Sequence, residues 1–271
     1  MLTITLLKVT HSGRAEAKKL HPFIESCDVF APENSYCTLA EAVDAEREWQ
    51  QDLKSGKSRA QMKEVIAGRY HTLKSDERYY LETVWNSLYQ FRRPVFFLER
   101  FVPDVSHRLE ERKTEANTLS ESALDELALG RVDDYLRMDW QALQIANDVN
   151  AARDREMARN LEHEEAELRR KYSPLPANIK LTGLVGSVHT PERHMTLSVT
   201  PVDLRGTNHT IITDMGDARL RGLPFEEARV YQLRCGALEL FHHGLLPVPL
   251  ADIEQMDFPH LVDVLSKCPY K

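Results

Sequence analysis

The sequence predicts an α/β fold: a mostly parallel or mixed central sheet, flanked by helices, with a helical insertion. Two observations lead to this class. Residues 2–10, 95–98 and 179–188 are short runs rich in apolar side chains, many of them β-branched or aromatic, which is the pattern of buried strands. Longer segments with helical spacing of apolar residues separate these runs. Strands that alternate with helices in this way form parallel sheets with helices on their faces.

The N-terminal segment predicts a βαβ unit. Residues 2–10 are expected to form the first strand, and residues 14–26 an amphipathic helix with Ser12 as its cap. Residues 28–31 are then a short apolar strand that Pro32 ends. A helical crossover of this kind joins two parallel strands.

Two helical segments, residues 38–92 and 104–172, are expected as insertions in, or a cap on, a single α/β domain of residues 1–271. The first segment begins with a capping box, because Glu41 follows Thr38 by three positions. Candidate N-caps of further helices in this segment are Ser58 and Ser75.

Residues 196–271 are expected to form a C-terminal extension for which the pattern defines only single elements. They carry no motif that indicates a function. The elements expected in and just before this extension are strands over residues 195–202 and 210–213 and helices over residues 224–243 and 258–267.

Composition excludes several classes of protein. The net charge is −7, from 35 basic and 42 acidic residues, and a non-specific nucleic-acid binder would need a basic face. No apolar run approaches the roughly 20 residues that a membrane-spanning helix requires. The four cysteines form no C-x-x-C pair, which favours reduced thiols over a disulfide or zinc framework. We therefore expect a cytoplasmic protein without nucleic-acid or membrane partners.

Four polar residues directly follow predicted strands: His11, Glu33, Glu99 and His189. In open α/β sheets, ligands bind beyond the carboxyl ends of the strands. Two imidazoles and two carboxylates that meet at this edge would form a divalent-metal or acid–base site. Taken singly, these residues have ordinary alternatives, since His11 can cap a helix and Glu33 can lie in solvent.

Five short motifs follow one another in order over roughly the first 195 residues. The motifs are Lys8-Val9-Thr10-His11, the strand that ends in Glu33, Pro94-Val95-Phe96-Phe97-Leu98-Glu99, Arg153-Asp154 with Met157-Ala158, and Gly186-Ser187-Val188-His189. In order and spacing these motifs resemble those of the superfamily that joins TraB, GumN, the Tiki metalloproteases, the ChaN haem-binding lipoproteins and erythromycin-esterase-type enzymes. Lys8 stands where that superfamily has glycine, and Arg159-Asn160 competes for the helical motif.

This resemblance implies a divergent metal-dependent hydrolase of the esterase or peptidase type, acting on a small-molecule or peptide substrate. His11 and His189 would be ligands of Mn, Co or Zn, and Glu33 and Glu99 would be catalytic. Arg153 would bind a substrate carboxylate or phosphate, or orient one of the two glutamates through a bidentate bond. The ordinary alternative for this arginine is a surface ion pair on its own helix, with Asp148 or Glu156.

Two other interpretations remain open from the sequence. The first is a non-catalytic ligand-binding protein, with haem as one ligand, or a signalling-regulatory protein on the same scaffold. The lysine in the first motif favours a site that has drifted in this way. The second is an unrelated α/β domain whose resemblance is accidental. Whether His11, Glu33, Glu99 and His189 lie in one cluster discriminates between these interpretations.

Overall fold

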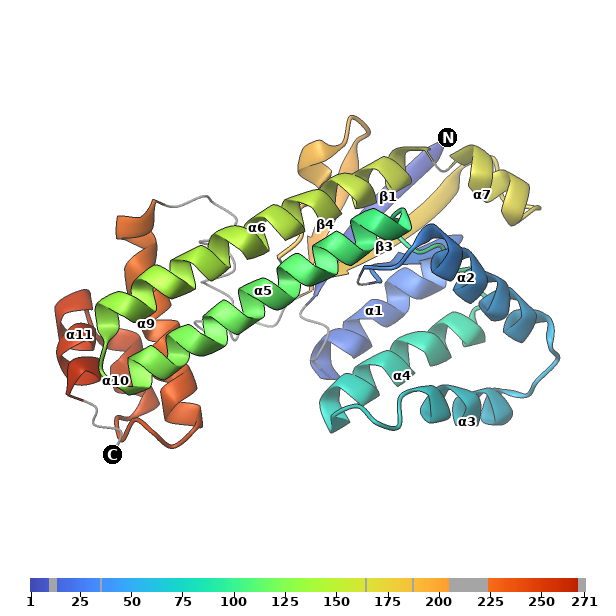
Figure 1. The fold of residues 1–271 in the computed structure, drawn as a ribbon. Coiled ribbons are helices and arrows are strands. Elements are labelled where there is room, and N and C mark those ends of the chain that lie inside the picture. Colours follow the sequence, from blue (N-terminus) through green and yellow to red (C-terminus); the bar gives the residue numbers. More distant parts are fainter. Residues whose placement is uncertain (10–13, 35, 164, 187, 205–223, 268–271) are drawn as a thin grey trace. The chain divides into compact units, whose positions relative to one another are not determined.

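The structure is a computed structural model that describes residues 1–271 except 10–13, 35, 164, 187, 205–223 and 268–271 (Figure 1). The chain divides into two compact units. One comprises Met1–His107 and Ala152–Asn208, and the other comprises Arg108–Ala151 and His209–Lys271. Each unit is described by itself below. The predicted strand over residues 210–213 lies outside the described residues.

A parallel sheet of four strands forms the centre of the first unit and confirms the predicted α/β class. Its order is β2-β3-β1-β4, with every neighbouring pair parallel. The chain passes from β1 through α1 to β2, which is the predicted βαβ unit. The strands are β1 (Leu2–Val9), β2 (Val29–Pro32), β3 (Ile179–Gly186) and β4 (Val199–Asp203).

Helices account for most of the rest of the described chain (Figure 1). In the first unit, and in the two long helices that contribute residues to both units, they are α1 (Arg14–Ser26), α2 (Leu39–Lys54), α3 (Arg59–Arg69), α4 (Ser75–Gln90), α5 (Pro103–Ala128), α6 (Val132–His163), α7 (Glu165–Lys171) and the short 3-10 helix η1 (Pro191–His194). In the second unit they are α9 (Phe225–His242), α10 (Leu250–Gln255) and α11 (Phe258–Ser266). No helix among the residues described here is long and apolar enough to span a bilayer.

Alternating side chains place two apolar clusters on the two faces of the sheet. Leu7 and its neighbours pack against apolar and aromatic residues of α1 to α4, with Trp49 and Tyr80 fully buried among them. Leu6 faces the other way and packs with residues of α6 and α7, among them Met157. The period of two along β1 explains this separation. The sheet is therefore a buried layer with apolar clusters on both faces. Polar side chains can gather at the carboxyl ends of its strands.

Two of the predicted helix caps, Thr38 and Ser58, are confirmed, whereas Ser12 lies outside the described residues. The capping box between Thr38 and Glu41 is present at the start of α2, and Ser58 caps α3 in the same way. Ser75 is the first residue of α4 and not its cap, because Lys74 occupies the cap position without a side-chain hydrogen bond. The prediction for Ser75 was wrong by one position. Acidic residues in the first turn of α4 supply an alternative stabilisation of its N-terminus.

Residues 95–98 do not form a strand of the sheet, although the sequence predicts one. They run parallel to β2 through a single bridge between Phe30 and Val95 and three backbone hydrogen bonds. One of these bonds joins the Leu98 amide to the Pro32 carbonyl at 3.1 Å. The segment therefore ends beside the end of β2, which is where Glu99 begins.

The second unit has its own helical core, built from α9 to α11 with residues of α5 and α6. Leu127, Leu233 and Leu265 are fully buried in it. Gly236 of α9 allows close packing here, because a Cβ atom at this position would lie 2.4 Å from Leu127 Cδ2 and 2.8 Å from the Tyr135 ring. The residues named in the sequence as candidates for chemistry do not belong to this unit.

Candidate functional site

The carboxyl ends of β2, β3 and the segment 95–98 meet at one edge of the sheet. Pro32 is in register with Leu184, and the Glu33 amide donates to the Leu184 carbonyl at 2.8 Å. This places Glu33 beside the end of β3, from which the chain leads to His189. The sheet-edge argument made from the sequence therefore describes the positions of Glu33, Glu99 and His189 correctly. His11 lies outside the described residues.

Arg153 of α6 bridges the two glutamates. Its Nη2 atom lies 2.6 Å from Glu33 Oε1 and 2.5 Å from Glu99 Oε1, and its Nε donates to the same Glu99 oxygen at 2.7 Å. The side chains of Arg153, Glu33 and Glu99 are 5%, 10% and 0% exposed. Burial and paired geometry exclude the surface ion pair with Asp148 or Glu156 and agree with the orienting role predicted for this arginine.

The next residue of the helix, Asp154, holds His189. Its Oδ1 lies 2.7 Å from His189 Nδ1, and its Oδ2 accepts from the backbone amide and the hydroxyl of Thr190. His189 Nε2 faces Glu33 Oε1 at 3.4 Å. Asp154 thus fixes the orientation of a buried imidazole whose other nitrogen faces a glutamate. The sequence placed Asp154 in a motif but assigned it no role.

Tyr36 is a further residue of the site that the sequence did not indicate. Its backbone φ angle is 57°, which lies in the left-handed region that non-glycine residues seldom adopt. Its amide donates to Glu99 Oε2 at 2.7 Å, and its carbonyl accepts from the Ser106 hydroxyl. Its ring covers the Arg153 guanidinium, with 4.9 Å between Cζ and the ring centroid. The strained residue therefore orders both partners of the central ion pair.

Charges in the site shift one another's pKa values. Burial raises the pKa of Glu99, and the neighbouring Arg153 opposes this only in part. Burial acts to lower the pKa of Arg153, but the attraction of Glu99 and Glu33 outweighs it and raises the pKa overall. For His189, burial also acts downward, while the hydrogen bonds to Asp154 and Glu33 raise its pKa to about 9. The site therefore brings two basic side chains, Arg153 and His189, together with three acidic ones.

Tyr80 of α4 extends this electrostatic environment. Burial raises the pKa of its phenol first of all, and the carboxylates of Glu16 and Glu33 raise it further. Glu16 lies in the first turn of α1 and is itself buried. Tyr80 is buried in the core and also lies within electrostatic reach of the site.

Lys8 does not disturb the strand that carries the first motif. It is in register with Val185 on one side and Asp203 on the other, within continuous parallel pairing. Its Nζ lies 2.5 Å from Glu192 Oε1 of η1, in a largely buried ion pair. Lys8 therefore has a charge partner of its own.

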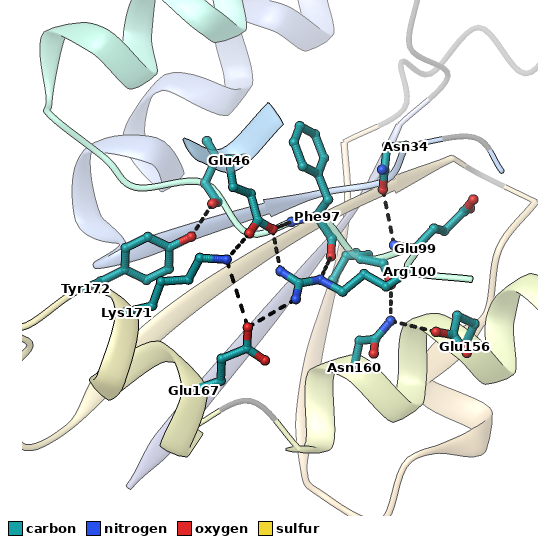
Figure 2. A network of polar contacts seen from close by, with 12 residues as sticks. Asn34, Glu46, Phe97, Glu99, Arg100, Glu156, Asn160, Glu167, Lys171 and Tyr172 are labelled. Atoms are coloured by element: carbon teal, nitrogen blue, oxygen red, sulfur yellow. Dashed lines mark hydrogen bonds and ion pairs between the residues drawn. The ribbon is translucent and has the colours of Figure 1, made fainter. Parts of the chain in front are cut away.

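A second polar network begins at the residue after Glu99. Arg100 contacts Glu46 and Glu167, and Lys171 also contacts Glu46 (Figure 2). Glu46 Oε1 further accepts from the Phe97 amide at 2.8 Å. Consecutive residues of one extended segment thus take part in two networks, Glu99 in the site and Arg100 in this neighbouring one.

The described donors do not form a metal site as they stand. No group of three or more His, Cys, Asp and Glu side chains suited to a metal occurs among the residues that the structure covers. Both oxygens of Glu99 are occupied, by Arg153 and by the Tyr36 amide, and Glu33 Oε2 accepts from the Gly186 amide at 2.6 Å. The predicted Mn, Co or Zn ion stays a prediction, and its predicted ligand His11 lies outside the described part of the chain.

Haem, the other predicted cofactor, would need an accessible imidazole nitrogen as an axial ligand. His189 is 1% exposed, and its two nitrogens face Asp154 and Glu33. The geometry of this histidine therefore does not favour a haem ligand.

Comparisons with protein-family models, with curated proteins and with solved structures found no match. The resemblance to the TraB and Tiki superfamily therefore depends on the five sequence motifs alone and stays a prediction. What the chain does is argued below from the geometry of its own residues.

The raised pKa of His189 predicts that the stability of the fold depends on pH. Its value in the fold, about 9, is above the ordinary 6.5, so the folded state binds this proton more tightly than the unfolded chain does. The groups that face it are Asp154 of α6, Glu33 after β2 and, opposing the shift, Arg153. The stabilisation is complete below the unfolded value and is lost as the pH rises through the folded one.

We expect the free energy of unfolding to fall by roughly 3 kcal/mol across this window, at about 1.4 kcal/mol per pKa unit. Urea denaturation at a series of pH values measures it. The contribution of His189 is the difference in slope between the wild type and His189→Gln. Equal slopes in the two proteins would show that this histidine does not carry a raised pKa.

Proposed function

We propose that the chain is a hydrolase of ester or peptide bonds whose acid–base pair is His189 and Glu33. The observation that supports this is the buried line Asp154–His189–Glu33 at the carboxyl edge of a parallel sheet, with 2.7 Å and 3.4 Å between its charged atoms. This edge is where open α/β proteins bind their ligands. The resemblance of the sequence motifs to a hydrolase-containing superfamily points to the same class.

The roles of the residues follow from their charges. His189, with a pKa raised to about 9, carries a proton at neutral pH. Its Nε2 faces Glu33, so a leaving alcohol or amine receives this proton by taking the place of Glu33 at Nε2. Glu33 can accept a proton from the attacking water, whose oxygen then bonds to the carbonyl carbon as the bond to the leaving group breaks. Asp154 keeps the imidazole oriented, as a carboxylate does in other His-based hydrolases. Arg153 and Glu99 hold Glu33 in place.

The experiment is a hydrolysis assay on the purified full chain. A panel of p-nitrophenyl esters and a peptide mixture followed by mass spectrometry would be tested, each with EDTA and with added Mn²⁺. Substitution His189→Gln should lower the rate by about 10²–10⁴-fold. Substitution His71→Gln, at an exposed histidine in the same unit, is the matched control and should leave the rate unchanged.

Two results would contradict the proposal. One is a wild-type protein that hydrolyses no member of either panel above the blank. The other is an activity that His189→Gln retains. Titration with haemin, followed through the Soret band, tests the non-catalytic alternative in the same preparations.

A further inference from the structure

We propose that Arg153 occupies the position of a divalent cation, so that the centre works with a built-in organic cation and without a bound metal. The evidence is the position of a single nitrogen. Nη2 of Arg153 lies 2.6 Å from Glu33 Oε1 and 2.5 Å from Glu99 Oε1. Two carboxylate oxygens from different elements that converge on one point are what a hard divalent ion recruits. Here the guanidinium fills that point.

The remaining oxygens of the two carboxylates are fixed by the backbone. Glu33 Oε2 accepts from the Gly186 amide at 2.6 Å, and Glu99 Oε2 accepts from the Tyr36 amide at 2.7 Å. Neither carboxylate can turn to present both oxygens to an ion without breaking one of these bonds. A buried amide left without an acceptor is costly. The carboxylates are therefore arranged for a partner between them, and that partner is already part of the chain.

The guanidinium is held as firmly as its acceptors. The Arg153 side chain is 5% exposed, and the Tyr36 ring lies over it at 4.9 Å. Arginine keeps its charge at every pH at which proteins are folded, and its planar donors match two carboxylates well. A metal would have to displace this cation from a buried, hydrogen-bonded position. The inference concerns the charge at the centre and does not depend on the chain being a hydrolase.

The test is metal uptake and thermal stability of the wild type, Arg153→Ser and Arg153→Lys. After incubation with MnCl₂ or ZnCl₂ and dialysis, metal per chain is measured by mass spectrometry. The wild type should retain no stoichiometric metal, and its Tm should not change with EDTA or Mn²⁺. Arg153→Ser frees two converging carboxylates and should bind Mn²⁺ or Zn²⁺, with a rise in Tm of roughly 5 °C at saturating metal. Arg153→Lys keeps a cation and should stay metal-independent.

Arg159→Ser is the matched control, since this arginine lies on the same helix with its side chain 61% exposed. It should behave as the wild type does. Stoichiometric metal in the wild type that is lost in His189→Gln would overturn the proposal, and so would a folded Arg153→Ser that takes up no metal. If Arg153→Ser does not fold, the wild type and Arg153→Lys decide: insensitivity of both to Mn²⁺ and EDTA supports the proposal, and a metal-dependent Tm in either overturns it.

Discussion

Asp154→Ala is expected to lower the free energy of unfolding by about 3–5 kcal/mol, because it removes one partner of a buried ion pair. Asp154 accepts from three donors: Nδ1 of His189, and the amide and hydroxyl of Thr190. His189 and Thr190 are both buried, so water does not replace the acceptor that their donors lose. His189 would then lose the hydrogen bond to Asp154, which is the largest contribution that raises its pKa. The variant should therefore also show a weaker fall in stability between neutral and alkaline pH.

Asp148→Ala is the matched control. Asp148 is an exposed carboxylate on the same helix, and its replacement should change stability by no more than about 0.5 kcal/mol. Urea denaturation of both variants at neutral pH gives the comparison. An Asp154→Ala protein as stable as Asp148→Ala would mean that the His189 pair does not hold the end of β3 to α6.

A second substitution isolates the pair itself. In the double variant Asp154→Leu with His189→Leu, neither charge is left buried without a partner. The loss in the double variant should therefore be smaller than the sum of the two single losses, with a coupling of about 1–3 kcal/mol. Losses that simply add would indicate that the two residues stabilise the fold independently.

The edge of the sheet was predictable because it depends on short-range patterns. Apolar runs mark the strands, and parallel strands bring their carboxyl ends to one side. The residues that follow those runs, Glu33, Glu99 and His189, could therefore be placed near each other without a structure. Arg153 came from a motif on a helix, for which the sequence left open a substrate anion, one of the two glutamates or a surface ion pair as its partner. Its burial between both glutamates was not predicted.

The parts of the site that escaped prediction depend on contacts between distant segments. Tyr36 follows a predicted strand end, but no local pattern predicts its left-handed backbone. This conformation is stabilised by hydrogen bonds with the Glu99 carboxylate and the Ser106 hydroxyl, which lie far along the chain. Residues 95–98 have the composition of a strand, yet only one bridge forms. Composition describes a preference for extended backbone and does not fix the number of partners.

Glu46 shows the same limit for a charged residue. In the sequence it stands in Glu46-Arg47-Glu48, which has the appearance of a solvated helix face. In the structure its side chain is 0% exposed, while Glu48 of the same helix is exposed. The difference comes from two cations far along the chain, Arg100 and Lys171, which approach only in the folded state (Figure 2).

Glu46→Ala should therefore be the second strongly destabilising substitution, with a loss of about 3–5 kcal/mol. It would leave Arg100, whose side chain is 4% exposed, without its buried partner, and the Phe97 amide without an acceptor. Glu48→Ala is the matched control on the same helix and should change stability by no more than about 0.5 kcal/mol. Thermal and urea denaturation of the two variants measure the difference.

The same substitution probes how far the two networks depend on each other. Glu99 and Arg100 are consecutive, so a loosened Arg100 should disturb the position of Glu99 against Arg153. Glu46→Gln keeps the shape of the side chain and one acceptor oxygen, and should lose less stability than Glu46→Ala. If Glu46→Gln lowers the hydrolysis rate more than Glu48→Gln does while the protein stays folded, the Glu46 network positions the site. If the two rates are equal, the network stabilises the fold alone, because Glu99 then keeps its place through Arg153 and the Tyr36 amide.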